Sequence, residues 1–273
     1  MPLTTTTIGA YPKPESVKIP DWFDPGAMDS STTTRDYLAA IEKLGGEAEQ
    51  IIAEGVRQVI ADQVDCGIDI PTDGEVKREN YIHYHCRQLD GFDFENLTHR
   101  VLRGGAYETD LPTIRGPVKA RAPFLPDDWK LAQSCTDRPV KITLPGPMTI
   151  RDTTADEHYG DPRVLGRDLA EALNKEVLAL AEAGCRYIQI DEPLFARKPQ
   201  EALDFGLEHI ERCWQGVPAG VTKVMHMCCG YPNYLDQEDY AKADPQAYFE
   251  LARAVDESVV DAVSIEDAHR HND

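Results

Sequence analysis

The stretch Tyr187-Ile188-Gln189-Ile190-Asp191-Glu192-Pro193 indicates the fold, because a short apolar segment runs directly into an acidic pair and a proline. A helical pattern precedes it and ends at Gly184. The apolar face of that helix is formed by Leu169, Leu173, Val177 and Leu180. Apolar residues at this spacing share one side of a helix, and a glycine is a common helix end. The stretch therefore predicts a buried strand that follows a helix and carries polar side chains at its end.

The same unit recurs along the chain. Six strand-like segments, most followed by a helical pattern, lie at residues 4–8, 68–71, 140–144, 187–190, 223–228 and 262–265. Apolar residues at helical spacing predict helices at residues 52–64, 169–180, 203–210 and 248–255. Alternating strands and helices predict a parallel α/β sheet. Each segment ends in polar residues, glycine or proline, and barrel enzymes place their chemistry at the ends of many strands. An open doubly wound sheet concentrates its functional residues at one switch point and usually has a glycine-rich phosphate-binding turn. This sequence contains no such turn.

We therefore predict one α/β domain over residues 1–273, a (β/α)8 TIM barrel. Residues 89–138 interrupt the alternation and are rich in Gly, Pro and charge, so we expect them to form an excursion over the barrel mouth. Six strands fall about two strand–helix units short of an eight-stranded barrel. We expect the barrel to be truncated after its sixth strand, and this chain by itself to be poorly soluble and inactive.

Composition excludes several classes of partner. The net charge is −20, so no basic surface is available for nucleic acid or for an anionic membrane. No stretch approaches the length of a membrane span, and the N-terminus has no secretory pattern. The 7 cysteines are odd in number and lack framework spacing, which favours reduced thiols and a cytoplasmic location. The oligomeric state is not indicated.

A His-x-Cys pair, His226 and Cys228, ends the fifth strand-like segment. Side chains two residues apart on a strand point to the same face, so both can reach one metal ion. Imidazole nitrogen and thiolate sulfur are zinc ligands, although a buried cysteine is more often a small hydrophobe. Cys229 should face the other way. A second cluster, residues 83–86, is interpreted as helix surface and core.

Six motifs, in order, resemble the C-terminal catalytic domain of the cobalamin-independent methionine synthase family and its short stand-alone relatives. They lie at residues 5–12, 73–92, 144–150, 189–193, 226–228 and 264–266. The resemblance implies a barrel of the methionine synthase/uroporphyrinogen decarboxylase-like type.

The resemblance also implies an activity, which is zinc-dependent methyl transfer to a thiol, with homocysteine converted to methionine. The zinc ligands it implies are His226, Cys228 and Glu266, with a further cysteine expected beyond Asp273. It places Glu75 and Asp191 at the amino group of homocysteine, and Gly9 in the same substrate site. A zinc ion held by thiolates deprotonates a substrate thiol at neutral pH. The small-molecule partners are thus a thiol and a methyl donor.

The sequence departs from the family pattern in two motifs. Ala10 stands where the family usually has Ser, and residues 151–154 lack the Trp that stacks on folate. The predicted acceptor half of the reaction is retained, whereas methyltetrahydrofolate is not predicted as a good donor. The alternatives are another thiol or donor, such as coenzyme M, methylcobamide or an epoxide, and a uroporphyrinogen decarboxylase-like enzyme without zinc.

Overall fold

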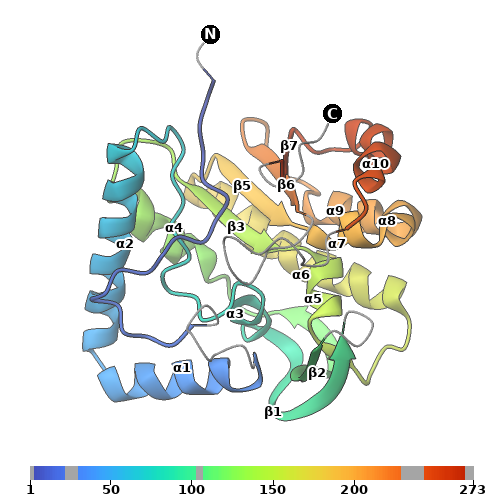
Figure 1. Cartoon of the computed structure of the whole chain (residues 1–273), viewed down its shortest axis with the longest axis horizontal. Helices are drawn as coiled ribbons and strands as arrows, with labels where there is room; N and C mark the ends of the chain where they lie inside the picture. The colour runs from blue at the N-terminus through green and yellow to red at the C-terminus, as the bar shows by residue number, and fades with distance from the viewer. Residues whose placement is uncertain (1–2, 22–29, 103–106, 229–242, 268–273) are drawn as a thin grey trace.

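A parallel sheet forms the centre of the molecule, and the computed structural model describes residues 3–21, 30–102, 107–228 and 243–267. Its strands are adjacent in the order β3 (Lys141–Pro145), β5 (Tyr187–Asp191), β6 (Thr222–Met227) and β7 (Ala262–Ile265) (Figure 1). Two isolated parallel bridges extend it, because Thr72 pairs with Lys141 and Thr6 pairs with Ile70. Six neighbouring parallel segments thus follow chain order, and the predicted parallel α/β architecture is confirmed.

The sheet is open over the residues that the structure describes. There, β7 pairs with β6 alone, and the segment at Thr6 pairs with the segment at Ile70 alone. A closed TIM barrel is therefore not confirmed. None of the helices in the described ranges combines the length and apolar character that crossing a bilayer requires.

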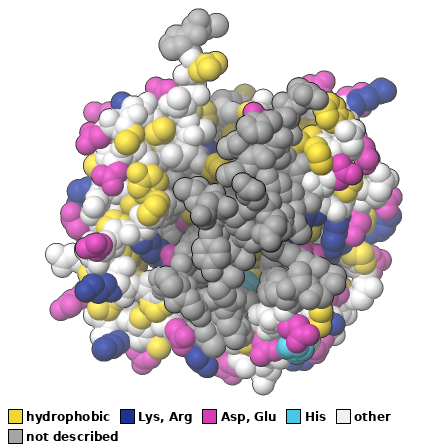
Figure 2. Space-filling model, viewed as in Figure 1, with side chains coloured by type: hydrophobic (Ala, Val, Ile, Leu, Met, Phe, Trp, Pro, Cys, Tyr) yellow, Lys and Arg dark blue, Asp and Glu magenta, His cyan; other side chains and the backbone are white. Residues whose placement is uncertain are grey.

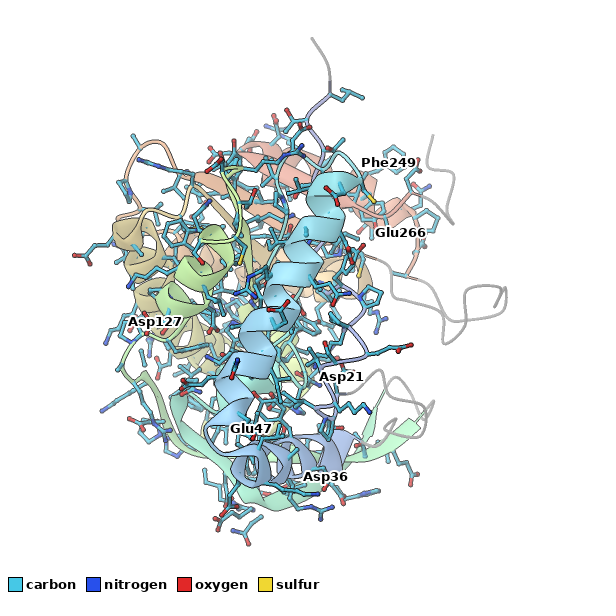
Figure 3. The ribbon with its side chains drawn as sticks, turned by 90° about the vertical axis from the view of Figure 1, so that its left-hand side faces the viewer. Asp21, Asp36, Glu47, Asp127, Phe249 and Glu266 are labelled. Carbon is cyan, nitrogen blue, oxygen red and sulfur yellow. The ribbon has the colours of Figure 1, made fainter. Side chains whose placement is uncertain are left out.

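The helices confirm the apolar patterns and add elements that the sequence did not predict. Their bounds are α1 Ser30–Leu44, α2 Glu47–Asp65, α3 His83–Cys86, α4 Leu125–Gln133, α5 Pro147–Asp152, α6 Pro162–Ala183, α7 Pro193–Arg197, α8 Pro199–Glu201, α9 Leu207–Cys213 and α10 Gln246–Asp256. Predicted helices at 52–64, 169–180 and 248–255 lie inside α2, α6 and α10. Gly184 ends α6 in the left-handed region, at φ 111°. Figure 3 shows α2 running beside α4 towards α1.

The pattern at residues 203–210 is not one α-helix. A π-helical turn, η2 (Ala202–Gly206), leads into α9, so the apolar spacing spans two helix types. At Gly206 a Cβ atom would lie 2.6 Å from the sulfur of Met148 and 3.0 Å from the ring of Phe195. The missing side chain lets this turn pack closely against α5 and α7.

Residues 89–138 fold into a ribbon and a helix. Strands β1 (Leu89–Leu102) and β2 (Tyr107–Ala120) pair antiparallel, and the short β4 (Ala155–Asp156) adds to β2. The pairing shifts register after Asp90, where Gly91 has φ 94° and approaches Gly116 so closely that a Cβ would lie 2.7 Å from its carbonyl oxygen. The glycines, which suggest a loop in the sequence, therefore permit a register shift within an antiparallel ribbon. A position over a barrel mouth stays a prediction.

The parallel sheet has one apolar and one polar face, because side chains alternate along each strand. The apolar face carries Ile142, Leu144, Ile188, Ile190 and Met225, all with no exposed surface. They belong to one core with the apolar side of α6. Burying each such side chain stabilises the fold by roughly 1.5–3 kcal/mol. The opposite face carries Lys141, Thr143, Gln189, Asp191 and His226, all buried as well. The acidic side chains of the surface are scattered across the face drawn in Figure 2.

Candidate active site

The ends of the parallel strands bring predicted site residues into one row. In the sheet register, Asp191 of β5 is the partner of His226 of β6, and His226 is the partner of Ser264 of β7. Paired residues of parallel strands point to the same side, so these three side chains lie on the polar face. Cys228 and Glu266 follow two residues after His226 and Ser264, immediately beyond the strands. Figure 3 shows Glu266 beyond the end of β7.

His226 is buried and neutral, and a neighbouring side chain fixes the orientation of its ring. Only 3% of its surface is exposed, and its Nδ1 lies 3.0 Å from the Ser264 hydroxyl oxygen. Burial, assisted by the charge of Lys141, lowers the pKa of His226 to about 4. Its Nε2 atom is buried and has no hydrogen-bond partner among the residues that the structure describes. A neutral imidazole with one nitrogen held by a neighbour and the other unused has the form of a metal ligand.

The donor types of the predicted set fit zinc, since His226 supplies nitrogen, Cys228 sulfur and Glu266 oxygen. Cys228 is 4% exposed. Over the described residues, however, no three His, Cys, Asp or Glu side chains are gathered closely enough to hold a metal ion. The predicted ligand set therefore stays a prediction. Cys229, His269 and His271 lie outside the described residues.

The second histidine and cysteine cluster forms part of the interior. His83, His85 and Cys86 lie in α3 and are all buried, so the predicted core position is confirmed and the predicted surface position is wrong. His85 packs edge-on against Tyr84 and Phe124. Burial lowers the pKa of both histidines and raises that of the Cys86 thiol.

Glu75 occupies a tight turn against Gly9. Its φ of 55° is the one positive value at a non-glycine residue among those described, a conformation that costs roughly 1–3 kcal/mol. Its Oε1 accepts a 2.7 Å hydrogen bond from the Thr143 hydroxyl and lies 3.4 Å from Arg78 Nη1. A Cβ at Gly9 would lie 2.7 Å from the same oxygen. The glycine thus leaves room for the carboxylate, and the contacts of Glu75 hold the strained turn.

Asp191 is coupled to Glu75 through charge. Burial, followed by the repulsion of Glu75, raises the pKa of Asp191 to about 8. Hydrogen bonding from Gln189 and the charges of Lys141 and Arg78 act in the opposite direction. Two carboxylates that destabilise each other in a buried site are suited to bind a cation, because a positive ligand relieves their repulsion.

Sequence reasoning missed the polar residues beneath these carboxylates. Arg78 is 3% exposed; its guanidinium lies 3.5 Å from Asp73 and donates to the carbonyl oxygen of Thr143. Lys141 and Gln189 lie in predicted strands, and the sequence predicts no functional role for them. The available signal was their period-two alternation with isoleucines, which marks a polar face inside a buried sheet.

Two surface hollows lie elsewhere. One, of about 270 Å³, is lined by α6, η2 and α9 residues that include Arg163 and His209. The other, of about 490 Å³, is formed by residues 13–21. Neither includes Asp191 or His226. The chemical groups at the strand ends, and not these hollows, define the candidate site.

The fold and the site together define a class, which is the α/β enzymes with functional groups at the carboxyl ends of parallel strands. The family model of the cobalamin-independent synthase catalytic domain matches residues 3–272. The chain therefore belongs to this family.

Curated relatives and a solved structure agree with the family. The methionine synthase of Sulfolobus acidocaldarius is 31% identical over 245 residues, which span 89% of this chain and 66% of the relative. That of Saccharolobus solfataricus is 34% identical over 235 residues, spanning 84% and 63%. The chain thus matches just under two thirds of the length of each. A B12-independent methionine synthase from Shewanella sp. W3-18-1, solved with selenomethionine, superposes with a TM-score of 0.78 at 29% identity, covering 96% of this chain and 72% of that one.

Proposed function

We propose that this chain supplies the zinc and homocysteine sites for methyl transfer to the thiol of homocysteine, which gives methionine. The observation that carries the proposal is the row of Asp191, His226 and Ser264 on one face, where His226 Nε2 is buried and has no hydrogen-bond partner within the described part of the chain. The selenomethionine bound by the Shewanella relative supports an amino acid of this shape as ligand.

His226, Cys228 and Glu266 would hold the zinc ion, which as a Lewis acid would keep the substrate thiol in its thiolate form. The chain's own contribution begins with His226, whose low pKa keeps the imidazole unprotonated throughout the neutral range. Ser264 contacts Nδ1 and thereby fixes the plane of the ring. The ligand is therefore preorganised before any metal binds.

Glu75 and Asp191 would bind the ammonium group of the amino acid. Their mutual repulsion favours a cation between them, and the short contacts of Glu75 with Thr143 hold one carboxylate in place. Asp191 must lose its proton to act as a charged partner, so ammonium binding would be coupled to proton release. The binding of the amino group would thus position the thiol relative to His226.

The methyl donor is proposed to be other than methyltetrahydrofolate. The segment that aligns with the family's stacking Trp ends α5, where Arg151 pairs with Glu201 and Asp152 pairs with Lys198. These ion pairs provide no aromatic face for a pterin. The names of the relatives, cobalamin-independent and B12-independent, argue against methylcobamide.

We also propose that the six parallel segments belong to one (β/α)8 barrel, that residues 89–138 lie across its mouth, and that the protein acts in the cytoplasm. The order of the segments along the sheet supports the barrel. The cysteine count supports a reducing compartment.

Zinc content tests the ligand assignment directly. In the purified full chain, Cys228→Ser and His226→Gln should each lower bound zinc sharply. The matched control is Cys66→Ser, since Cys66 is exposed at the end of α2 and should leave zinc unchanged. X-ray absorption should show sulfur at about 2.3 Å and nitrogen at about 2.0–2.1 Å from the metal. Zinc content that is the same in Cys228→Ser as in the control would show that the assignment is wrong.

A further inference from the structure

A buried lysine, Lys141, lies on the same face of the parallel sheet as Asp191. Lys141 is 2% exposed, and its Nζ atom donates to the carbonyl oxygen of Thr7 and to Oε1 of Gln189, both at 2.6 Å. Removing an ammonium group from water is costly unless the interior provides partners. Both of these partners are neutral oxygens, so the lysine is not explained by a direct ion pair.

The lysine determines which way the Gln189 carboxamide faces. A lysine ammonium can only donate hydrogen bonds, so the atom that meets it must be the carboxamide oxygen. The amide nitrogen of Gln189 is then directed to the other side, where it donates to the carbonyl oxygen of Ile8 at 2.9 Å and to Asp191 Oδ1 at 2.7 Å. Both amide hydrogens have an acceptor, and a flipped carboxamide would place NH2 against the ammonium.

The network ends at the side chain proposed to bind substrate. Gln189 precedes Asp191 by two residues on β5 and therefore shares its face, while Lys141 comes from the neighbouring β3. All three side chains are buried and lie on strands, which gives the carboxylate a single fixed orientation. Gln189 holds Oδ1 of Asp191 at 2.7 Å and thereby restrains the carboxylate.

We propose that Lys141 is a positioning residue for amino-acid binding: by fixing the Gln189 carboxamide it orients Asp191 to accept the substrate ammonium. The proposal rests on the proposed function, because it takes Asp191 as the ammonium partner. Lys141 itself touches neither substrate nor metal. Its effect should therefore depend on Gln189 and should be confined to ligands that carry an amino group.

Calorimetric titration with two ligands tests this role in the full chain. The ligands are L-methionine and 4-(methylsulfanyl)butanoate, which is methionine without its amino group. Wild-type chain should bind methionine roughly tenfold or more tightly than the analogue, the value of a hydrogen bond to a charged group. Lys141→Met should reduce this preference to less than about threefold while binding of the analogue is retained. The control Lys43→Met, at an exposed position of α1, should keep the full preference.

A double variant keeps the test valid if Lys141→Met by itself folds poorly. The double variant Lys141→Met with Gln189→Leu replaces both polar groups by apolar ones, which buried sites often tolerate. Because Lys141 acts through Gln189, the double variant should lose no more preference for methionine than Gln189→Leu alone. Losses that add would show that Lys141 acts by another route and would overturn the proposal.

The outcomes separate the positioning role from the proposed function. If wild-type chain prefers methionine and Lys141→Met keeps that preference, the positioning role is wrong and the function stands. If Lys141→Met weakens both ligands equally, the lysine is only structural and the proposal is again overturned. If wild-type chain shows no preference for the amino group, then Asp191 is not its partner and both ideas fail.

Discussion

Glu192 fixes the start of α5 on the end of β5, and its replacement should be among the most damaging changes in the chain. The side chain has no exposed surface. Its Oε1 accepts from the backbone N–H of Met148 at 2.8 Å, and its Oε2 accepts from the N–H and hydroxyl of Thr149 at 3.1 and 2.8 Å. Pro147 at the helix start has no N–H to offer, so Glu192 accepts the first two donors that α5 presents.

The loss of stability follows from the backbone N–H donors that lose their acceptor. Glu192→Ala leaves the N–H groups of Met148 and Thr149 buried and unpaired, at roughly 1–3 kcal/mol each, and leaves a cavity as well. We expect the free energy of unfolding to fall by about 3–6 kcal/mol, against a typical total of about 5–15 kcal/mol. Glu192→Gln keeps one oxygen, which can retain the bonds to Thr149, so it should cost only about 1–3 kcal/mol.

Urea unfolding of the full chain at one fixed pH measures both values. The control is Glu182→Ala on the exposed side of α6, which should lie within about 0.5 kcal/mol of wild type. Gly146→Ala provides an independent test, since its Cβ would lie 2.2 Å from Glu192 Oε1 and must displace the same carboxylate. A cost below about 1 kcal/mol for Glu192→Ala, or equal costs for Ala and Gln, would refute this reasoning.

Three further predictions concern the candidate site. Burial lowers the pKa of His226 to about 4, so between pH 6.5 and 4 the unfolded chain gains a proton that the folded chain does not. The stability of the metal-free protein should therefore fall by up to about 3 kcal/mol over that range, and urea unfolding of His226→Gln should show a flatter profile. Asp191→Asn should raise the KM for homocysteine at least tenfold while zinc content, measured on the same preparation, is retained; parallel loss of zinc would contradict a role in ammonium binding. Methyltetrahydrofolate should be a poor donor in a methionine-formation assay, and efficient turnover with it would show that the missing aromatic residue at 151–154 is not needed.

The sequence predicted the parallel arrangement because the signals for it are local. Apolar residues at helical spacing in α2, α6 and α10, and apolar runs ending in polar residues, can be recognised without knowing what packs against them. The antiparallel ribbon of β1 and β2 could not be recognised in this way. Its glycines and prolines indicate a loop, and only the close approach of Gly91 to the backbone of Gly116 and Pro117 shows why a small residue is needed there.

For the candidate site, too, the sequence predicted some properties and not others. The residue types at the strand ends, including Glu75, Asp191 and His226, could be selected from the sequence because strand ends of α/β proteins meet at one edge. Their protonation states could not be inferred from the sequence, since the pKa of His226 depends on burial and on Lys141, which is far away in the chain.

By itself, the sequence determined the order of the parallel segments, the helices α2, α6 and α10, and the polar residues that end the strands, because these depend on spacing within a few residues. Only the tertiary structure decided that a lysine in a buried strand would meet the carbonyl oxygen of Thr7, 134 positions away, and that Gln189 would meet Ile8, 181 positions away. Those contacts fix the orientation of Gln189 and Asp191. Hydrogen bonds between distant strands depend on register and burial, which no local pattern encodes.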